Sequence, residues 1–212
     1  MEATCAPPLG PQELRLYWCV ERLDSLSRRA RVDQLLRAAL APLVGVSAPS
    51  LLFGREAKGR PYLRHPQAPD FNLTDTSGGT LIAVSAAARI GVDVERTDRR
   101  PPVDKLAARW FDGEEAQALR GLSAEQARSA FLRLWTAKEA SCKATGTGIF
   151  GYLSQWRFDV LSAHPQLQTA PIDAGENKRW QHLRLAPTDE HTAVVALRDA
   201  PSLLLTAYLL GV

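Results

Sequence analysis

The segment from Gly91 to Glu95 alternates apolar residues with two acidic ones. Successive side chains of a strand point to opposite faces, so this pattern predicts a strand with Asp93 and Glu95 on one face and valines facing a core on the other. Two carboxylates on one face repel each other unless a cation lies between them. Either a metal ion meets this need, or the face is solvated with Arg89 and Arg96 as ion-pair partners.

A second segment about forty residues later, Trp135 to Lys143, has the sequence WTAKEASCK. On a helix Trp135, Glu139 and Lys143 share one side, and Lys138 lies about 100° round. Taken alone, Glu139 and Lys143 are an ordinary exposed i,i+4 pair worth roughly 0.5 kcal/mol. Taken with the acidic strand, three carboxylates and flanking lysines suit a divalent metal bound to a phosphate ester. We therefore expect the chain to handle a polyphosphate.

Hydrophobic periodicity and capping residues predict an α+β chain. The expected helices cover residues 27–43, 103–111, 113–120 and 124–144, the last ended by glycines. The expected strands cover residues 13–21, 49–54, 80–85, 90–95, 156–161, 181–186, 191–197 and 203–209. The order strand, helix, strands occurs twice. We therefore expect two similar α+β lobes, an N-terminal lobe of residues 1–88 and a C-terminal lobe of residues 89–212 that carries the metal and phosphate motifs.

Composition limits the setting of the protein. The 212 residues are 45% hydrophobic and 23% charged, which is typical of a globular chain. No apolar run has the roughly 18 residues of a membrane span, and no signal peptide is evident, so a cytoplasmic protein without membrane contact is expected. Cys5, Cys19 and Cys142 form no metal or disulfide pattern and are expected to be reduced. The formal net charge of +3 is too small to indicate a nucleic-acid binder.

The two motifs together resemble the signature of the 4′-phosphopantetheinyl transferases of the surfactin-synthetase-activating (Sfp) type. Weaker landmarks agree in their order along the chain. They are Gly59-Arg60-Pro61-Tyr62, Phe71-Asn72-Leu73-Thr74, Phe111-Asp112-Gly113-Glu114-Glu115 and Gly146-Thr147-Gly148. The resemblance spans about residues 28–161. The length of the chain is closer to that of the two-lobed monomeric members than to that of the half-size trimeric holo-acyl-carrier-protein synthases.

The resemblance implies a fold and a reaction. Two lobes related by a pseudo-twofold axis would hold coenzyme A in the cleft between them. The enzyme would transfer 4′-phosphopantetheine to a serine of an apo carrier protein and release 3′,5′-ADP, with positioning and electrostatics doing most of the catalysis. The partner would be an acyl, polyketide or peptidyl carrier whose serine begins an acidic helix.

The resemblance also implies roles for single residues. Asp93, Glu95 and Glu139 would hold Mg²⁺, although Mn²⁺ accepts the same oxygen ligands. Lys138 and Lys143 would neutralise phosphate oxygens. Glu139 would take the serine proton, directly or through a metal-bound water.

Three arginines are further candidates for coenzyme A binding. Arg28 and Arg31 on the first helix and Arg60 in the glycine-proline turn would approach the adenine end of coenzyme A, since arginine binds phosphate through paired hydrogen bonds. A basic solvated helix face explains Arg28 and Arg31 equally well.

Asp75 departs from the family pattern, which usually has histidine near a phosphate at this position. A carboxylate would repel phosphate there unless an arginine or backbone amides bind it. We hypothesise that Asp75 orients Arg60 or caps the loop that follows.

Two other classes of protein stay open at this point. A noncatalytic module that binds coenzyme A or carrier proteins would keep the cleft but lose a metal ligand, and no ligand is missing here. An RNA- or phosphate-binding module would interleave aromatic residues on a basic face, and the tryptophans here lie in apolar patterns.

Overall fold

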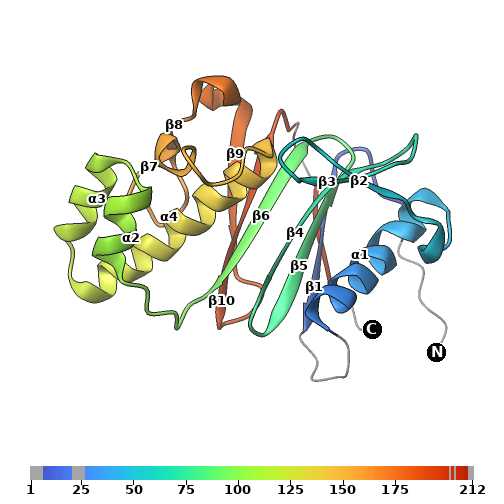
Figure 1. Ribbon diagram of the computed structural model, residues 1–212, viewed down its shortest axis with the longest axis horizontal. Helices are drawn as coiled ribbons and strands as arrows, with labels where there is room; N and C mark the ends of the chain where they lie inside the picture. The colour runs from blue at the N-terminus through green and yellow to red at the C-terminus, as the bar shows by residue number, and fades with distance from the viewer. Residues whose placement is uncertain (1–6, 21–26, 201, 203, 210–212) are drawn as a thin grey trace.

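Four layers, in the order helix, sheet, sheet, helix, make up the body of the protein (Figure 1). The computed structural model describes residues 7–20, 27–200, 202 and 204–209. The first helix, α1 (Arg28–Val44), covers a four-stranded sheet. That sheet has the order β11 (Leu204–Leu209), β1 (Glu13–Val20), β5 (Gly79–Ser85) and β4 (Asp70–Thr76).

The second sheet has three antiparallel strands in the order β6 (Arg89–Arg96), β10 (His191–Arg198) and β9 (Trp180–Leu185). The longest helix, α4 (Ala124–Thr145), packs on its outer face, with α2 (Val103–Trp110) and α3 (Gly113–Arg120) beside it (Figure 1). Two short ribbons complete the strands, β2 (Phe53–Arg55) with β3 (Pro61–Leu63) and β7 (Arg157–Phe158) with β8 (Leu167–Thr169). Short 3₁₀ turns cover Ala48–Ser50, Leu153–Gln155, Ile172–Ala174 and Asn177–Arg179.

Three hydrophobic clusters hold these layers together. One lies between α1 and the first sheet, and another lies between the second sheet and the C-terminal helices. The third lies between the two sheets and takes Leu14 and Leu81 from one, and Ile90, Val92 and Val195 from the other. Because Ile90 and Val92 face this central cluster, the alternate residues of β6 face α4, as the sequence pattern predicts.

The helices agree closely with the prediction because their ends carry strong signals. Asp112 with Glu115, and Ser123 with Gln126, form the expected capping boxes. Gly146 ends α4 in the left-handed conformation at φ 73°. The mixed α+β class is confirmed.

Three strand predictions need correction. The predicted strand at 156–161 is a strand over Arg157–Phe158 alone, with a 3₁₀ turn before it. The predicted strand at 49–54 begins only at Phe53. The last strand, β11, is assigned to the C-terminal lobe by its position in the sequence, but it pairs parallel to β1 and so lies in the first sheet. Residues 21 and 203 of the predicted strands, and Cys5, lie outside the described residues, whereas Cys19 and Cys142 are free and buried.

Candidate functional site

The site begins where α4 lies directly on β6. A Cβ atom on Gly91 would lie only 2.0 Å from the carbonyl oxygen of Ala140 and 2.4 Å from the nitrogen of Ala144. Only glycine permits this approach of strand and helix backbones. As a result, Asp93 and Glu95 on β6 face the same turns of α4 that carry Glu139 and Lys143.

A row of polar side chains on β4 joins the two sheets. Asp70 Oδ2 accepts a hydrogen bond from the Ile90 nitrogen at 2.7 Å, and Asn72 Oδ1 accepts one from the Val92 nitrogen at 3.0 Å. Thr74 Oγ1 donates to Asp93 Oδ1 at 3.1 Å. These three residues are two apart, so they share one face of β4. The landmark Phe71 to Thr74 therefore positions β6 beside the first sheet.

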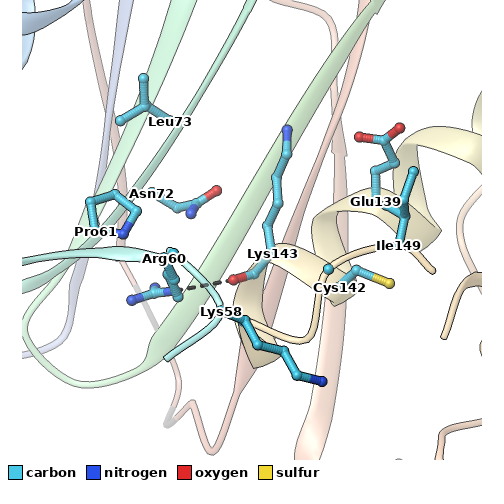
Figure 2. A pocket seen from close by; sticks show the side chains of 12 residues that line it. Lys58, Arg60, Pro61, Asn72, Leu73, Glu139, Cys142, Lys143 and Ile149 are labelled. Carbon is cyan, nitrogen blue, oxygen red and sulfur yellow. Dashed lines mark hydrogen bonds between the residues drawn. The ribbon is translucent and has the colours of Figure 1, made fainter. Parts of the chain in front are cut away.

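A cavity of about 300 Å³ opens between β4, the β2–β3 turn and α4 (Figure 2). Its N-terminal wall comes from the turn and from β4, and its C-terminal wall comes from α4 and the loop after it. The lining residues are Lys58, Gly59, Arg60, Pro61, Asn72, Leu73, Glu139, Cys142, Lys143, Gly146, Gly148 and Ile149.

Asp93 is the most buried acid beside the cavity, with 4% of its surface exposed. Lys143 Nζ donates to Asp93 Oδ1 at 2.7 Å and to the Val92 carbonyl at 3.1 Å. The other carboxylate oxygen, Oδ2, is buried and accepts no hydrogen bond from any described residue. A buried carboxylate oxygen without a partner is costly, so this atom calls for a cation or another donor.

The other two predicted metal ligands are electrostatically coupled to Asp93. Burial, and then the charge of Asp93, raises the pKa of Glu95 to about 7. Burial, the charge of Asp93 and, to a smaller extent, the charge of Glu95 raise the pKa of Glu139 to about 7. Arg99, which forms an ion pair with Glu95 and lies 6.0 Å from the centre of the Trp135 ring, opposes both shifts. Glu95 and Glu139 are thus carboxylates whose pKa is raised by a neighbouring carboxylate, and positive charge beside them would relieve this repulsion.

The donor set suits a hard divalent cation, although the side chains are not assembled around one. Within the described ranges, no three His, Cys, Asp or Glu side chains lie close enough to share a metal ion as they stand. The unpartnered Oδ2 of Asp93 and the mutually repelling Glu95 and Glu139 nevertheless provide carboxylate oxygens, the ligands that Mg²⁺ prefers. The alternative ion pairs do not form: Arg89 pairs with Glu56, and Arg96 pairs with Asp98 and Glu190.

The structure does not leave Arg60 available to a ligand. Its guanidinium is bound inside the protein, although the side chain lines the cavity. It forms two hydrogen bonds to Asp70 and one each to the carbonyls of Phe71, Ile90 and Lys143, at 2.7 to 3.2 Å. The expected partnership between Arg60 and Asp75 is wrong, because Asp70 takes that place. Arg60 thus connects the β2–β3 turn to β4, β6 and the end of α4 (Figure 2).

Lys138 also lies apart from the cluster, and this corrects the prediction that it shares the site with Lys143. Its side chain is completely buried on another side of α4 and pairs with Glu115 at 2.6 Å. Burial lowers the pKa of the Lys138 ammonium group, and the Glu115 carboxylate opposes the shift. The offset of about 100° from Glu139 along the helix turns Lys138 into the C-terminal core.

Arg28, one of the arginines predicted to approach the adenine end of coenzyme A, is bound by Asp75. Arg28 forms an ion pair with Asp75, so the position that departs from the family pattern neutralises an arginine of α1. Arg28 is 66% exposed, and Arg31 is half-buried on the same helix. The structure therefore gives Asp75 an arginine partner, as hypothesised, but the partner is Arg28.

Lys58 is the cavity-lining cation that the sequence did not single out. It is exposed, and its ammonium group lies 4.6 Å from the centre of the Tyr152 ring. No ion pair of Lys58 is found among the described residues. One sequence signal could have identified Lys58: it directly precedes Gly59, the first residue of the turn landmark, where a lysine side chain can reach a ligand.

Three comparisons with known proteins bear on this site. Residues 89–196 match the model of the 4′-phosphopantetheinyl transferase superfamily. The chain is 35% identical over 167 residues to the 4′-phosphopantetheinyl transferase HetI of Nostoc sp., covering 77% of this chain and 67% of that protein. It is 37% identical over 175 residues to a putative 4′-phosphopantetheinyl transferase of Synechocystis sp., covering 82% and 70%. The holo-[acyl-carrier-protein] synthase of Thermotoga maritima superposes with a TM-score of 0.41 at 22% identity, over 54% of this chain and 65% of the other.

Proposed function

Since the chain belongs to the 4′-phosphopantetheinyl transferase superfamily, we propose that the cavity binds coenzyme A and that the acids beside it serve the transfer. The protein is a transferase that moves 4′-phosphopantetheine from coenzyme A to a serine of an apo carrier protein. The serine oxygen forms a bond to the phosphorus next to pantetheine, and the bond from that phosphorus to 3′,5′-ADP breaks. The observation that carries this assignment is the cavity itself, where Glu139 and Lys143 line a space next to the unpartnered oxygen of Asp93.

Asp93, Glu95 and Glu139 would hold the divalent metal, Mg²⁺ or Mn²⁺. A bound ion would supply positive charge beside the pyrophosphate oxygens. The raised pKa values of Glu95 and Glu139 support this placement. Without a metal ion the two carboxylates lack a cation that would stabilise their charged forms.

Two lysines are the best candidates for direct phosphate contacts. Lys143 lines the cavity and points from α4 toward β6, where Asp93 holds its ammonium group (Figure 2). Lys58 approaches from the opposite wall. Arg28 and Arg31 remain proposals for the adenine end, and Arg28 would first have to leave Asp75.

Glu139 is the group best placed to receive the serine proton. It lines the cavity that we propose binds coenzyme A, so a carrier serine that enters the cavity would meet this carboxylate. Lys143 lies one helical turn away and stabilises the negative charge that collects on the leaving phosphate.

Several finer predictions of the sequence belong to the same proposal. We expect a monomer whose two lobes are related by a pseudo-twofold axis, divided near residue 88, with coenzyme A between them. We expect the carrier to present its serine at the start of an acidic helix, and the reaction to take place in the cytoplasm. Among the described residues, no helix is both long and apolar enough to cross a membrane.

Mass spectrometry of purified apo carrier proteins incubated with the enzyme, coenzyme A and Mg²⁺ tests the proposal. A gain of about 340 Da on one serine is expected, and Glu139→Ala should abolish it. Glu125→Gln is a matched control on the same helix, because Glu125 is an exposed residue paired with Arg128. No gain on fatty-acid, polyketide or peptide carriers would refute the assignment, and coenzyme A binding without transfer would indicate a noncatalytic module.

A further inference from the structure

We propose that Lys138 is a positioning residue: with Glu115 it holds the loop after α4 in the place where that loop forms the cavity wall. The inference rests on the proposed function, because the ligand of the cavity is taken to be coenzyme A. It differs from the role implied by the motif, in which this lysine would touch phosphate.

The contacts of Lys138 are all internal. Its ammonium group pairs with Glu115 at 2.6 Å, donates to the Leu153 carbonyl at 3.1 Å and donates to the Trp156 carbonyl. It also lies 4.7 Å from the centre of the Phe111 ring. An ammonium group has three N–H donors, and these three acceptors account for them. The lysine therefore has no donor left for a phosphate.

Glu115 is held as completely as Lys138. The carboxylate is 3% exposed, and it accepts hydrogen bonds from the Phe158 nitrogen at 2.9 Å and from the Asp112 nitrogen at 3.1 Å. The pair thus joins the start of α3, the middle of α4 and the segment from Leu153 to Phe158. Removing one partner of such a buried pair leaves the other charge uncompensated, so the loss of either residue should disrupt the whole linkage.

Two contacts connect this linkage to the cavity. The Leu153 nitrogen donates to the Ile149 carbonyl at 3.1 Å, and Ile149 lines the cavity. The neighbouring Tyr152 carries the ring under Lys58 of the opposite wall. Because Lys138 donates a hydrogen bond to the Leu153 carbonyl, it helps to set the positions of both Ile149 and Tyr152.

The end of α4 is held by other residues, so the effect of Lys138 should be confined to the loop. Arg60 donates to the Lys143 carbonyl at 3.0 Å, and Arg89 donates to the Ala144 carbonyl at 2.6 Å. Gly91 keeps the helix against β6. Loss of Lys138 should therefore displace the loop after α4, which we expect to contact the parts of coenzyme A outside its pyrophosphate. Lys143 and the three acidic residues of the site should keep their positions, so pyrophosphate binding should not change.

Binding by the full chain tests this division, with coenzyme A and inorganic pyrophosphate as separate probes in the presence of Mg²⁺. The variants are Lys138→Met and Glu115→Gln, measured well below their own unfolding temperatures. Both should raise the Kd for coenzyme A at least fivefold and leave the Kd for pyrophosphate within twofold. Arg133→Met is the matched control, because Arg133 also ties α4 to a backbone carbonyl, that of Val160, away from the cavity. It should change neither Kd.

Each other result counts against the proposal. A matching loss of pyrophosphate affinity in Lys138→Met would place that lysine on the phosphates. Lower unfolding temperatures with unchanged coenzyme A binding would make the pair merely structural. If Lys138→Met does not fold, Glu115→Gln decides alone, and an unchanged Kd for coenzyme A in that variant overturns the inference. A parent chain that binds neither probe would refute the proposed function itself.

Discussion

Arg60 is a cavity-lining residue whose hydrogen bonds all lie within the protein. Its guanidinium binds one carboxylate and three backbone carbonyls from separate elements, and its side chain is only 3% exposed. It also lies at the C-terminal end of α4, where a cation interacts favourably with the helix dipole. Such a residue contributes to the site by keeping its walls together.

Replacing Arg60 with methionine should therefore cost stability. The change leaves Asp70 without its cation and three carbonyls without their donor, and breaking a buried pair on one side typically costs about 3 to 5 kcal/mol. Because Asp70 is 25% exposed, we expect about 3 kcal/mol, measured by urea unfolding without ligand.

Lys58→Met on the same turn is the control for Arg60→Met. Because Lys58 is exposed, its loss should change the unfolding free energy by less than about 0.5 kcal/mol. Equal unfolding free energies for Arg60→Met and the parent chain would contradict the cross-linking role of Arg60.

Single residues also mark the limit of what the sequence could predict. The motifs identify Asp93, Glu95, Glu139 and Lys143 as neighbours, because strand and helix periodicity fix the side on which each lies. They do not reveal that Lys138 turns to Glu115. That partner comes from another helix, and no local pattern records its position.

At the scale of elements, the junction of β6 and α4 should respond to pH. In the metal-free protein the pKa values of Glu95 and Glu139 are about 7, against an ordinary value of 4.5. Between these values the folded chain binds more protons than the unfolded chain, so the unfolding free energy falls as the pH rises. We expect these two acids to lower it by about 1 to 3 kcal/mol between pH 5 and pH 7.5.

The measurement compares the parent chain with Glu95→Gln/Glu139→Gln in EDTA, by urea unfolding at both pH values. The difference removes contributions of other groups, such as His182, whose pKa burial lowers to about 3. Mg²⁺ should recover the loss at pH 7.5 in the parent chain only. If the two proteins follow the same pH profile, the coupled acidic junction is disproved.

Elements were predicted well where their ends are marked by side chains. The capping boxes and the glycine after α4 gave accurate helix bounds, since each satisfies end groups of its own helix. Pairing partners were not predictable in the same way. The strand β11 has an apolar sequence that suits either sheet, and its parallel place beside β1 depends on contacts about 190 residues apart.

The whole molecule should unfold in one step. The central cluster takes Leu14 and Leu81 from one sheet and Ile90 and Val195 from the other, so opening either half exposes apolar residues of both sheets. Tryptophan fluorescence and far-UV circular dichroism should report the same urea midpoint. Ile90→Ala should lower that midpoint equally by both probes, while two separate midpoints would show that the halves are independent domains.

The row of Asp70, Asn72 and Thr74 joins β4 to β6 through side chains where sheets ordinarily join through backbone groups. Side chains act here as spacers, and their length sets how far apart the two strands lie. Asn72 also lines the cavity opposite the residues of α4. Through Asn72, the length of these side chains therefore also bears on the width of the cavity.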